Sequence, residues 1–297
     1  MATVEKALEA WGPPVYVRRQ IVHNVHVVRD LERRGAVFVE SEEDVPEGAT
    51  VVFSAHGVAP EVHERARARR LSTIDATCPL VTKVHSEARH YADRGYTVLV
   101  VGHAGHEEIE GTMGEAPEAT ILVETCADAE SLELDPDRPL AYLTQTTLSV
   151  DDTAEIVDIL RRRFPRIVAP RKEDICYATT NRQAAVKELA GEVELLLVVG
   201  SRNSSNSNRL VEVAQAAGLP AHLIDDESEI DEAWFEGVEA VGVTSGASAP
   251  ESLVRRVCAW FGARGATEIR THRSVEENVS FRFPAPFRDT LEAGRPW

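Results

Sequence analysis

The sequence predicts an α/β fold: three similar α/β units with mainly parallel sheets, in a pseudo-threefold arrangement around a central site, with the first unit truncated. Two observations support this prediction. Apolar strand-like segments alternate with helix-like segments along most of the 297 residues, a pattern typical of parallel sheets covered by helices. Similar polar motifs also recur at an interval of about 98 residues, which indicates an internal repeat. The predicted units span residues 1–76, 77–172 and 173–297.

The predicted first unit begins within a helix rather than a strand. Apolar residues recur at helical spacing in 3–11, and Gly12-Pro13-Pro14 ends this helix. After it, strand-like and helix-like segments alternate as far as residue 76. Strands are predicted at 15–17, 36–39, 50–54 and 71–76, and helices are predicted to end at Gly35 and to cover 60–70.

The second and third units follow one order of elements. In each, a cysteine precedes a helix, a buried strand then ends in a glycine, and a later strand ends in a loop rich in hydroxyl side chains. The predicted strands lie at 97–101, 120–123, 140–143, 194–199, 221–224 and 240–243. The predicted helices end at Gly95, Phe164, Gly191 and Gly218, and one begins at Pro250. Because ligands bind at the carboxyl ends of parallel strands, we expect the polar loops to line one site.

Cys78 follows a short strand and directly precedes Pro79, a residue suited to the first turn of a helix. At a helix N-terminus, free N–H groups and the positive end of the helix dipole favour a thiolate. Cys78 is therefore a candidate metal ligand or nucleophile, although a small buried cysteine would give the same local pattern.

Cys176 is the counterpart of Cys78 in the internal repeat. Two equivalent cysteines that do not form a local Cys-x-x-Cys pair argue against a zinc ribbon or a thioredoxin-type motif. Soft thiolates donated by equivalent units suit an iron–sulfur cluster on the pseudo-symmetry axis, which would make the central site a cluster site. Cys126 and Cys258, in an acidic loop and in an apolar helix, are interpreted as structural.

Four histidines each follow a predicted strand: His23, His56, His103 and His106. One such histidine is ordinarily a polar surface or core residue, but four at strand ends favour a site. Glu108, beside His106, is a candidate general acid if a dry pocket holds its proton. The alternative is a solvated acidic loop shared with Glu107 and Glu110.

Hydroxyl and amide side chains gather at two predicted helix N-termini, at Ser204, Ser205, Asn206 and Ser248. Together with free backbone N–H groups they would form an anion site that needs no lysine. N-capping is the alternative explanation for some of them. The run from 203 to 208 is richer in such residues than capping requires, which favours a phosphate or diphosphate ligand.

Composition narrows the class of protein. The formal net charge of −17 argues against binding to nucleic acid or to an anionic membrane surface. No apolar run approaches the ~18–20 residues of a membrane span, and no signal-peptide pattern opens the chain. Four cysteines without a secretory signal indicate a reducing compartment, so a cytoplasmic protein is predicted.

Eight motifs resemble those of the 4-hydroxy-3-methylbut-2-enyl diphosphate reductase family, the IspH/LytB family. One of them reads Asp-Ala-Thr-Cys-Pro-Leu-Val-Thr-Lys-Val-His, from Asp75 to His85. The resemblance covers nearly the whole chain, in order. The motifs lie at 22–24, 54–57, 75–85, 102–111, 144–149, 174–183, 200–210 and 244–250.

The resemblance implies three α/β units around a [4Fe–4S] cluster with three cysteine ligands, and a reaction that removes the substrate hydroxyl as water to give isopentenyl and dimethylallyl diphosphates. It implies that ferredoxin or flavodoxin donates the electrons. By motif, Cys78 and Cys176 would be two of the cluster ligands and Glu108 the proton source. The substrate would be bound by His23, His56, His106, Thr146, Ser204, Ser205, Asn206 and Ser248.

The chain departs from the family pattern at its first residues. The family opens with a strand and a Gly-Phe-Cys-Ala-Gly type of loop that bears the first cluster cysteine, whereas this sequence begins in the following helix. Two interpretations follow: Met1 is an internal residue of a longer protein, or the chain is a degenerate, non-catalytic paralogue that binds diphosphates. A zinc-dependent hydrolase using Cys78, Cys176 and His106 is a further alternative.

Overall fold

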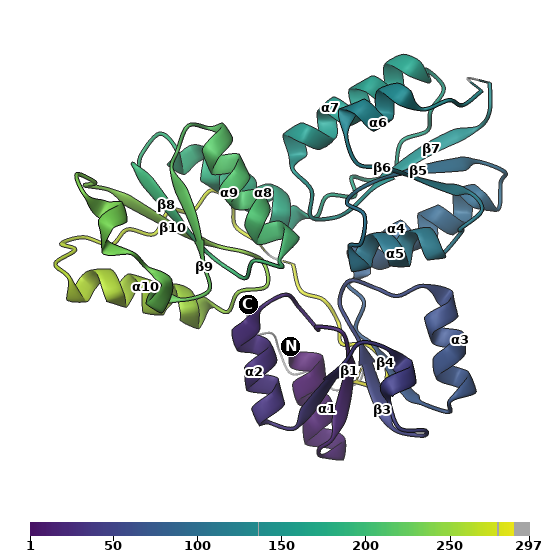
Figure 1. The fold of residues 1–297 in the computed structure, drawn as a ribbon, viewed down its shortest axis with the longest axis horizontal. Coiled ribbons are helices and arrows are strands. Elements are labelled where there is room, and N and C mark those ends of the chain that lie inside the picture. Colours follow the sequence, from purple (N-terminus) through teal and green to yellow (C-terminus); the bar gives the residue numbers. More distant parts are fainter. Residues whose placement is uncertain (136, 278, 288–297) are drawn as a thin grey trace. The chain divides into compact units, whose positions relative to one another are not determined.

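A computed structural model describes residues 1–135, 137–277 and 279–287. The chain forms two compact units. The first comprises Met1–Val22, Asp30–Cys176 and the described part of Phe281–Glu292, and the second comprises His23–Arg29 and Tyr177–Ser280 apart from residue 278. All three sheets in the described residues are parallel, which confirms the predicted α/β fold class (Figure 1). Each sheet falls within one of the three predicted segments, whereas the division into three domains and their pseudo-threefold arrangement stay predictions.

The first unit contains two of the sheets. One has the strand order β2-β1-β3-β4 and the other the order β6-β5-β7, and every pairing is parallel. The strands of the first sheet are β1 (Val15–Arg18), β2 (Ala36–Val39), β3 (Thr50–Phe53) and β4 (Ser72–Asp75). Those of the second are β5 (Thr97–Val101), β6 (Thr120–Val123) and β7 (Leu140–Thr144).

Among the described residues, seven helices accompany these strands along the chain. They are α1 (Ala2–Trp11), α2 (Val25–Arg33), α3 (Pro60–Ala68), α4 (Pro79–Ala92), α5 (Glu107–Gly114), α6 (Cys126–Ser131) and α7 (Val150–Arg163). A 3-10 turn (Glu42–Asp44) lies between β2 and β3. The division between the two compact units falls within α2.

Helices cover both faces of the β6-β5-β7 sheet (Figure 1). Successive side chains of a strand point to opposite faces, so Leu99 and Val101 of β5 pack with α6 and α7 while Val98 and Val100 pack with α4 and α5. All five residues of β5 are buried. Burial on both faces explains why this strand is a continuous apolar run rather than an alternating one.

The second unit repeats this arrangement with the strand order β10-β8-β9. Its strands are β8 (Leu195–Val199), β9 (Ala221–Ile224) and β10 (Val241–Ser245), and its helices are α8 (Tyr177–Leu189), α9 (Ser205–Ala216) and α10 (Glu251–Ala263). Two 3-10 turns, Glu227–Glu229 and Glu232–Phe235, follow β9. Leu196 and Val198 pack with α8 and α9, whereas Leu197 and Val199 pack with α10.

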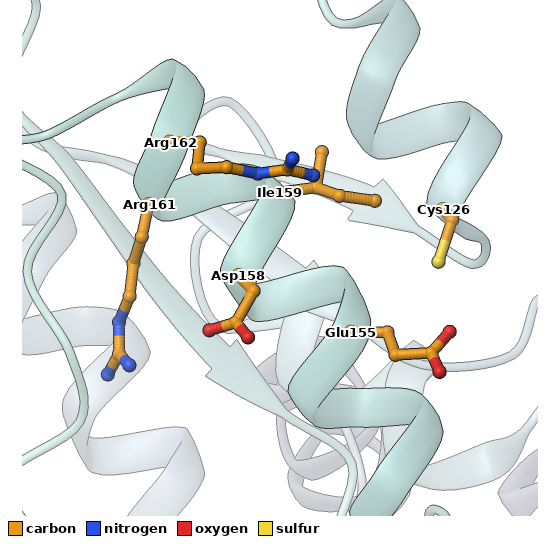
Figure 2. Close-up of a pocket in the computed structure, with 6 residues that line it drawn as sticks. All are labelled: Cys126, Glu155, Asp158, Ile159, Arg161 and Arg162. Atoms are coloured by element: carbon orange, nitrogen blue, oxygen red, sulfur yellow. The ribbon is translucent and has the colours of Figure 1, made fainter.

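Two short helices differ from the sequence-based expectation. The segments after β5 and β6 were expected to be loops, but they contain α5 and α6. Cys126 is therefore the first residue of α6, not part of an acidic loop, because Thr125 caps this helix by accepting a hydrogen bond from the Asp128 N–H. Cys126 lines a surface hollow together with α7 residues of mixed charge (Figure 2). None of the predicted site residues lines this hollow.

No helix in the described ranges is both long and apolar enough to cross a membrane.

Candidate active site

Glu108 is a buried carboxyl group in the first turn of α5. His106 is the N-cap of that helix, and its Nδ1 accepts a hydrogen bond from the Glu108 N–H at 3.1 Å. The Glu108 side chain reaches the loop after β7, where Oε1 accepts from the Thr146 N–H at 2.6 Å and Oε2 lies 2.9 Å from Thr146 Oγ1. Two strand-end loops of the same sheet thus meet at this carboxyl group.

Burial raises the pKa of Glu108 to about 7, since removal from water disfavours the charged carboxylate. Hydrogen bonds from Thr146 and the nearby His56 and His85 act in the opposite direction. The residue is 1% exposed, so the alternative of a solvated acidic loop does not apply to it. A carboxyl group with this pKa is substantially protonated at neutral pH and can donate a proton.

Thr146 connects the acid to the second cysteine. Its backbone carbonyl accepts the Cys176 N–H at 3.0 Å, while its own N–H and hydroxyl face Glu108. The neighbouring Gln145, 1% exposed, accepts the His103 N–H at 3.1 Å and donates to Thr147 Oγ1 at 2.9 Å. The loop after β7 therefore forms hydrogen bonds both with the loop after β5 and with the backbone of Cys176.

Cys78 is the N-cap of α4, as its position before Pro79 predicts. Its backbone N–H donates to Ala55 O at 3.0 Å, which ties it to the loop after β3. Burial raises the pKa of the Cys78 thiol. The N–H groups of Leu80 and Val81, which donate to the thiol, lower it in part.

The Cys78 thiol also experiences the charges of Cys176 and Glu108, and both raise its pKa. The structure thus brings the two cysteines and the acid together within the first unit. Two partly buried thiols that influence each other electrostatically are a soft donor set that fits an iron–sulfur cluster, because metal binding would displace the proton that burial retains on Cys78. Cys126 and Cys258 are also free thiols.

Two of the four predicted site histidines, His56 and His106, lie next to each other. The rings of His56 and His106 meet edge to face with centroids 5.8 Å apart. His56 Nδ1 lies 3.4 Å from Ser54 Oγ and 3.5 Å from a carboxylate oxygen of Glu107. Both rings are only partly buried.

His85 is a buried residue that the sequence reasoning did not select. Its Nδ1 lies 2.8 Å from Glu115 Oε1, and its ring fills the space beside Gly57 and Gly111. A Cβ atom at Gly57 would lie 2.9 Å from His85 Cε1, and one at Gly111 would lie 3.1 Å from the same atom. The imidazole therefore fixes the spacing between the loop that carries His56 and the helix that carries Glu108.

The hydroxyl-rich residues of the second unit surround the start of α9. Ser204 caps α9 by accepting the Ser207 N–H at 3.3 Å, so the capping explanation applies to its side chain. Ser205 is the first residue of the helix. Asn206 Oδ1 accepts the Ala247 N–H at 2.8 Å and its Nδ2 donates to Thr179 Oγ1 at 3.2 Å. Asn206 thereby joins α9 to the loop after β10.

The other residues of the second unit that are predicted to bind the substrate are His23 and Ser248. The Ser248 hydroxyl donates to the backbone carbonyl of His23 at 3.0 Å, which brings these two residues together. Ser207, which the sequence analysis included only as part of the run from 203 to 208, is fully buried, and its Oγ lies 3.0 Å from Ser204 Oγ. Its position three residues after an N-cap serine was the available signal.

Gly200 is expected to be essential for the shape of this serine cluster. A Cβ at position 200 would lie 2.2 Å from Ser207 Oγ and 2.7 Å from its Cβ, so Gly200→Ala must displace the start of α9. We expect this displacement to raise the KM for an anionic substrate. Loss of one well-formed hydrogen bond to a charged group would raise it by about 10-fold or more. Steady-state kinetics measures this effect, and Gly262→Ala, with open space around it, is the control. An unchanged KM would contradict the prediction.

Fold and site together define an α/β protein in which a buried carboxyl group with a pKa of about 7 lies near two free cysteines. The family model of the LytB protein matches residues 1–261. The chain belongs to the LytB protein family, which confirms the resemblance found in its motifs.

Curated relatives carry the name 4-hydroxy-3-methylbut-2-enyl diphosphate reductase. The protein from Acidothermus cellulolyticus is 59% identical over 297 residues, which cover 99% of this chain and 87% of the relative. The protein from Streptomyces avermitilis is 55% identical over 291 residues, covering 98% of this chain and 86% of the relative.

Solved structures of such reductases share the fold. The E-1-hydroxy-2-methyl-but-2-enyl-4-diphosphate reductase from Plasmodium falciparum aligns with a TM-score of 0.91 at 38% identity, covering 95% of this chain and 90% of that one. A structure of (E)-4-hydroxy-3-methyl-but-2-enyl diphosphate reductase aligns with a TM-score of 0.63 at 32% identity, covering 88% and 92%.

Proposed function

We propose that this protein reduces 4-hydroxy-3-methylbut-2-enyl diphosphate to isopentenyl diphosphate and dimethylallyl diphosphate, the final step of the non-mevalonate isoprenoid pathway. The observation that carries the proposal is the buried Glu108, held by Thr146 beside Cys78 and Cys176, in a chain 59% identical to a protein of that name. Removal of a hydroxyl group as water requires a proton donor at the leaving oxygen.

Cys78 and Cys176 would hold a [4Fe–4S] cluster, as two of the three cysteine ligands that the family resemblance implies. When bound, such a cluster supplies electrons one at a time and an iron that acts as a Lewis acid. Ferredoxin or flavodoxin is the proposed electron donor. Free cysteines throughout the chain suit a reducing compartment such as the cytoplasm.

The protein residues bind and protonate the substrate. Glu108 would donate its proton toward the departing hydroxyl, and the Thr146 hydroxyl, 2.9 Å from Glu108, would orient that end of the substrate and relay a proton. By the family motifs, the diphosphate would be bound by His56 and His106 and by further polar residues. Those residues are His23, Ser204, Ser205, Asn206 and Ser248. Fixing both ends of the substrate holds the reacting bond in place.

An anaerobic turnover assay tests the proposal. Full-length protein with reconstituted iron and sulfide is mixed with the substrate and a reduced viologen dye, and the products are identified by mass spectrometry. Formation of both isoprenoid diphosphates is the expected result. Diphosphate binding without turnover in iron-loaded protein would favour the non-catalytic paralogue, and zinc without iron or sulfide would favour the hydrolase.

A further inference from the structure

Asp174 is a buried charged residue that the proposed reaction does not use. It lies two positions before Cys176, and its side chain has no solvent exposure. A carboxylate is rarely buried unless it is paired and hydrogen-bonded. Its partners therefore show what it holds in place.

Both oxygens of Asp174 are bonded to elements of the candidate active site. Oδ2 accepts the N–H of Thr144, the last residue of β7, at 2.8 Å. Oδ1 accepts from the ammonium group of Lys83 at 2.5 Å, and Lys83 lies on α4, the helix that Cys78 caps. One carboxylate thus joins the Cys176 segment to the strand before Thr146 and to the helix after Cys78.

Additional hydrogen bonds attach the same segments to each other. Lys83 Nζ also donates to the backbone carbonyl of Lys172. Farther along α4, the Tyr91 hydroxyl donates to Ala169 O at 3.1 Å. On the other side, the Cys176 N–H bonds to Thr146 O at 3.0 Å, so residues 174–176 run beside 144–146 with a contact at each end.

We propose that Lys83 and Asp174 are positioning residues that fix the separation and direction of the Cys78 and Cys176 thiols, so that both can ligate one cluster. This inference rests on the proposed function, because it assigns the two thiols to a metal centre. Lys83 acts on the helix whose first turn presents Cys78, and Asp174 acts on the segment that ends in Cys176. Neither residue is expected to contact the substrate.

Single and double replacements of an ion pair have different effects on stability, and this difference can distinguish a positioning role of Lys83 and Asp174 from a purely structural role. Removing one partner leaves an uncompensated buried charge and is strongly destabilising, whereas replacing both partners by apolar residues is often neutral for stability. The double variant Lys83→Met/Asp174→Leu lacks the bonds that orient the two cysteines. It also removes the 3.6 Å pair of Lys83 with Glu87, so its melting temperature is measured first to show that it folds. Outer-shell partners of metal ligands typically contribute a factor of about 10–100 to metal affinity.

The first experiment compares cluster loss in full-length protein. Iron release to a chelator is followed by the cluster absorbance in the wild type, in the double variant and in Asp174→Asn, which preserves the side-chain shape. We expect release to be about 10–100-fold faster in the double variant and to be accelerated less in Asp174→Asn. The single variant Lys83→Arg retains the positive charge and should release iron as slowly as the wild type. Arg255→Met breaks an exposed pair with Glu251 on α10 and is the matched control.

The second experiment needs no cluster. In metal-free protein, alkylation of Cys78 and Cys176 by iodoacetamide is measured by mass spectrometry, with Cys126 in the same molecule as reference. We expect Cys176 to react about 10-fold faster in the double variant than in the wild type while the reaction of Cys126 and the melting temperature stay unchanged. Should the double variant not fold, Asp174→Asn decides by the same two readouts. In that variant the Lys83 ammonium is not left buried without a partner, because its side chain is 25% exposed and lies 3.6 Å from Glu87.

If the folded variants release iron and react at Cys176 at the wild-type rates, the proposal is wrong. Lys83 and Asp174 would then have only a structural role. A wild-type protein that takes up no iron and sulfide would contradict the proposed function instead. The alkylation comparison in metal-free protein would still show whether the pair positions the cysteines.

Discussion

Replacing Glu108 by glutamine is expected to lower kcat of the reductase reaction by about 10²–10⁴-fold, the usual contribution of a general acid. Glutamine has nearly the same shape and can still accept the Thr146 N–H, so the fold and substrate binding should be retained. The variant lacks the proton that burial holds on the Glu108 carboxyl, whose pKa is about 7. Stopped-flow or steady-state turnover with reduced viologen measures the loss.

The same residue predicts the direction of the pH dependence. A proton donor works only in its protonated form, so the wild-type rate should be retained below pH 7 and should fall as the pH rises through the Glu108 pKa of about 7. This fall should be absent from the residual activity of Glu108→Gln. Glu110→Gln, on the exposed side of α5 where Glu110 pairs with Arg19, is the control and should show the wild-type profile. A wild-type rate in Glu108→Gln would contradict the assignment.

Replacing either Cys78 or Cys176 by serine is expected to abolish turnover and to remove most of the bound iron. A direct ligand should matter more than the roughly 10–100-fold that loss of an outer-shell partner costs in affinity. Because serine is a harder and less acidic ligand than cysteine, it does not replace the thiolate on iron. Iron and sulfide analysis with the visible absorbance of the purified protein gives the readout.

Cys126→Ser and Cys258→Ser are the matched controls for these two variants. Cys126 begins α6 and lines the hollow beside α7, and Cys258 lies within α10. Neither is bonded to Thr146 or to the loop after β3. Both control variants should retain the iron content and the activity of the wild type, and a loss of iron in them equal to that in Cys176→Ser would show that the ligand assignment is wrong.

The central strands β5, β7 and β8 were predictable because burial on both faces produces continuous apolar runs, as in 97–101 and 195–199. The two short helices α5 and α6 were not. The α5 sequence combines three glutamates with two glycines and lacks a clear apolar stripe, and α6 is only six residues long. Their starts depend on single capping contacts, from His106 and Thr125, which leave a weak signal in the sequence.

The candidate site was predictable residue by residue, but its connections were not. Sequence reasoning selected Glu108 and Thr146 separately, whereas their pairing depends on β5 and β7 being neighbours in the sheet. The bond between Lys83 and Asp174 joins residues far apart in the chain. Two ordinary charged residues give no sequence signal that they will be buried against each other.

The packing of His85 against Gly57 and Gly111 also limits how the family's sequences can diverge. An alanine at position 111 would meet the imidazole at 3.1 Å, so the ring must move or be replaced by a smaller side chain. Gly57 has φ of 82°, a conformation that disfavours any other residue irrespective of space. Positions 85 and 111 should therefore covary among relatives while position 57 stays glycine. A double-mutant cycle should show that a smaller residue at 85 rescues Gly111→Ala.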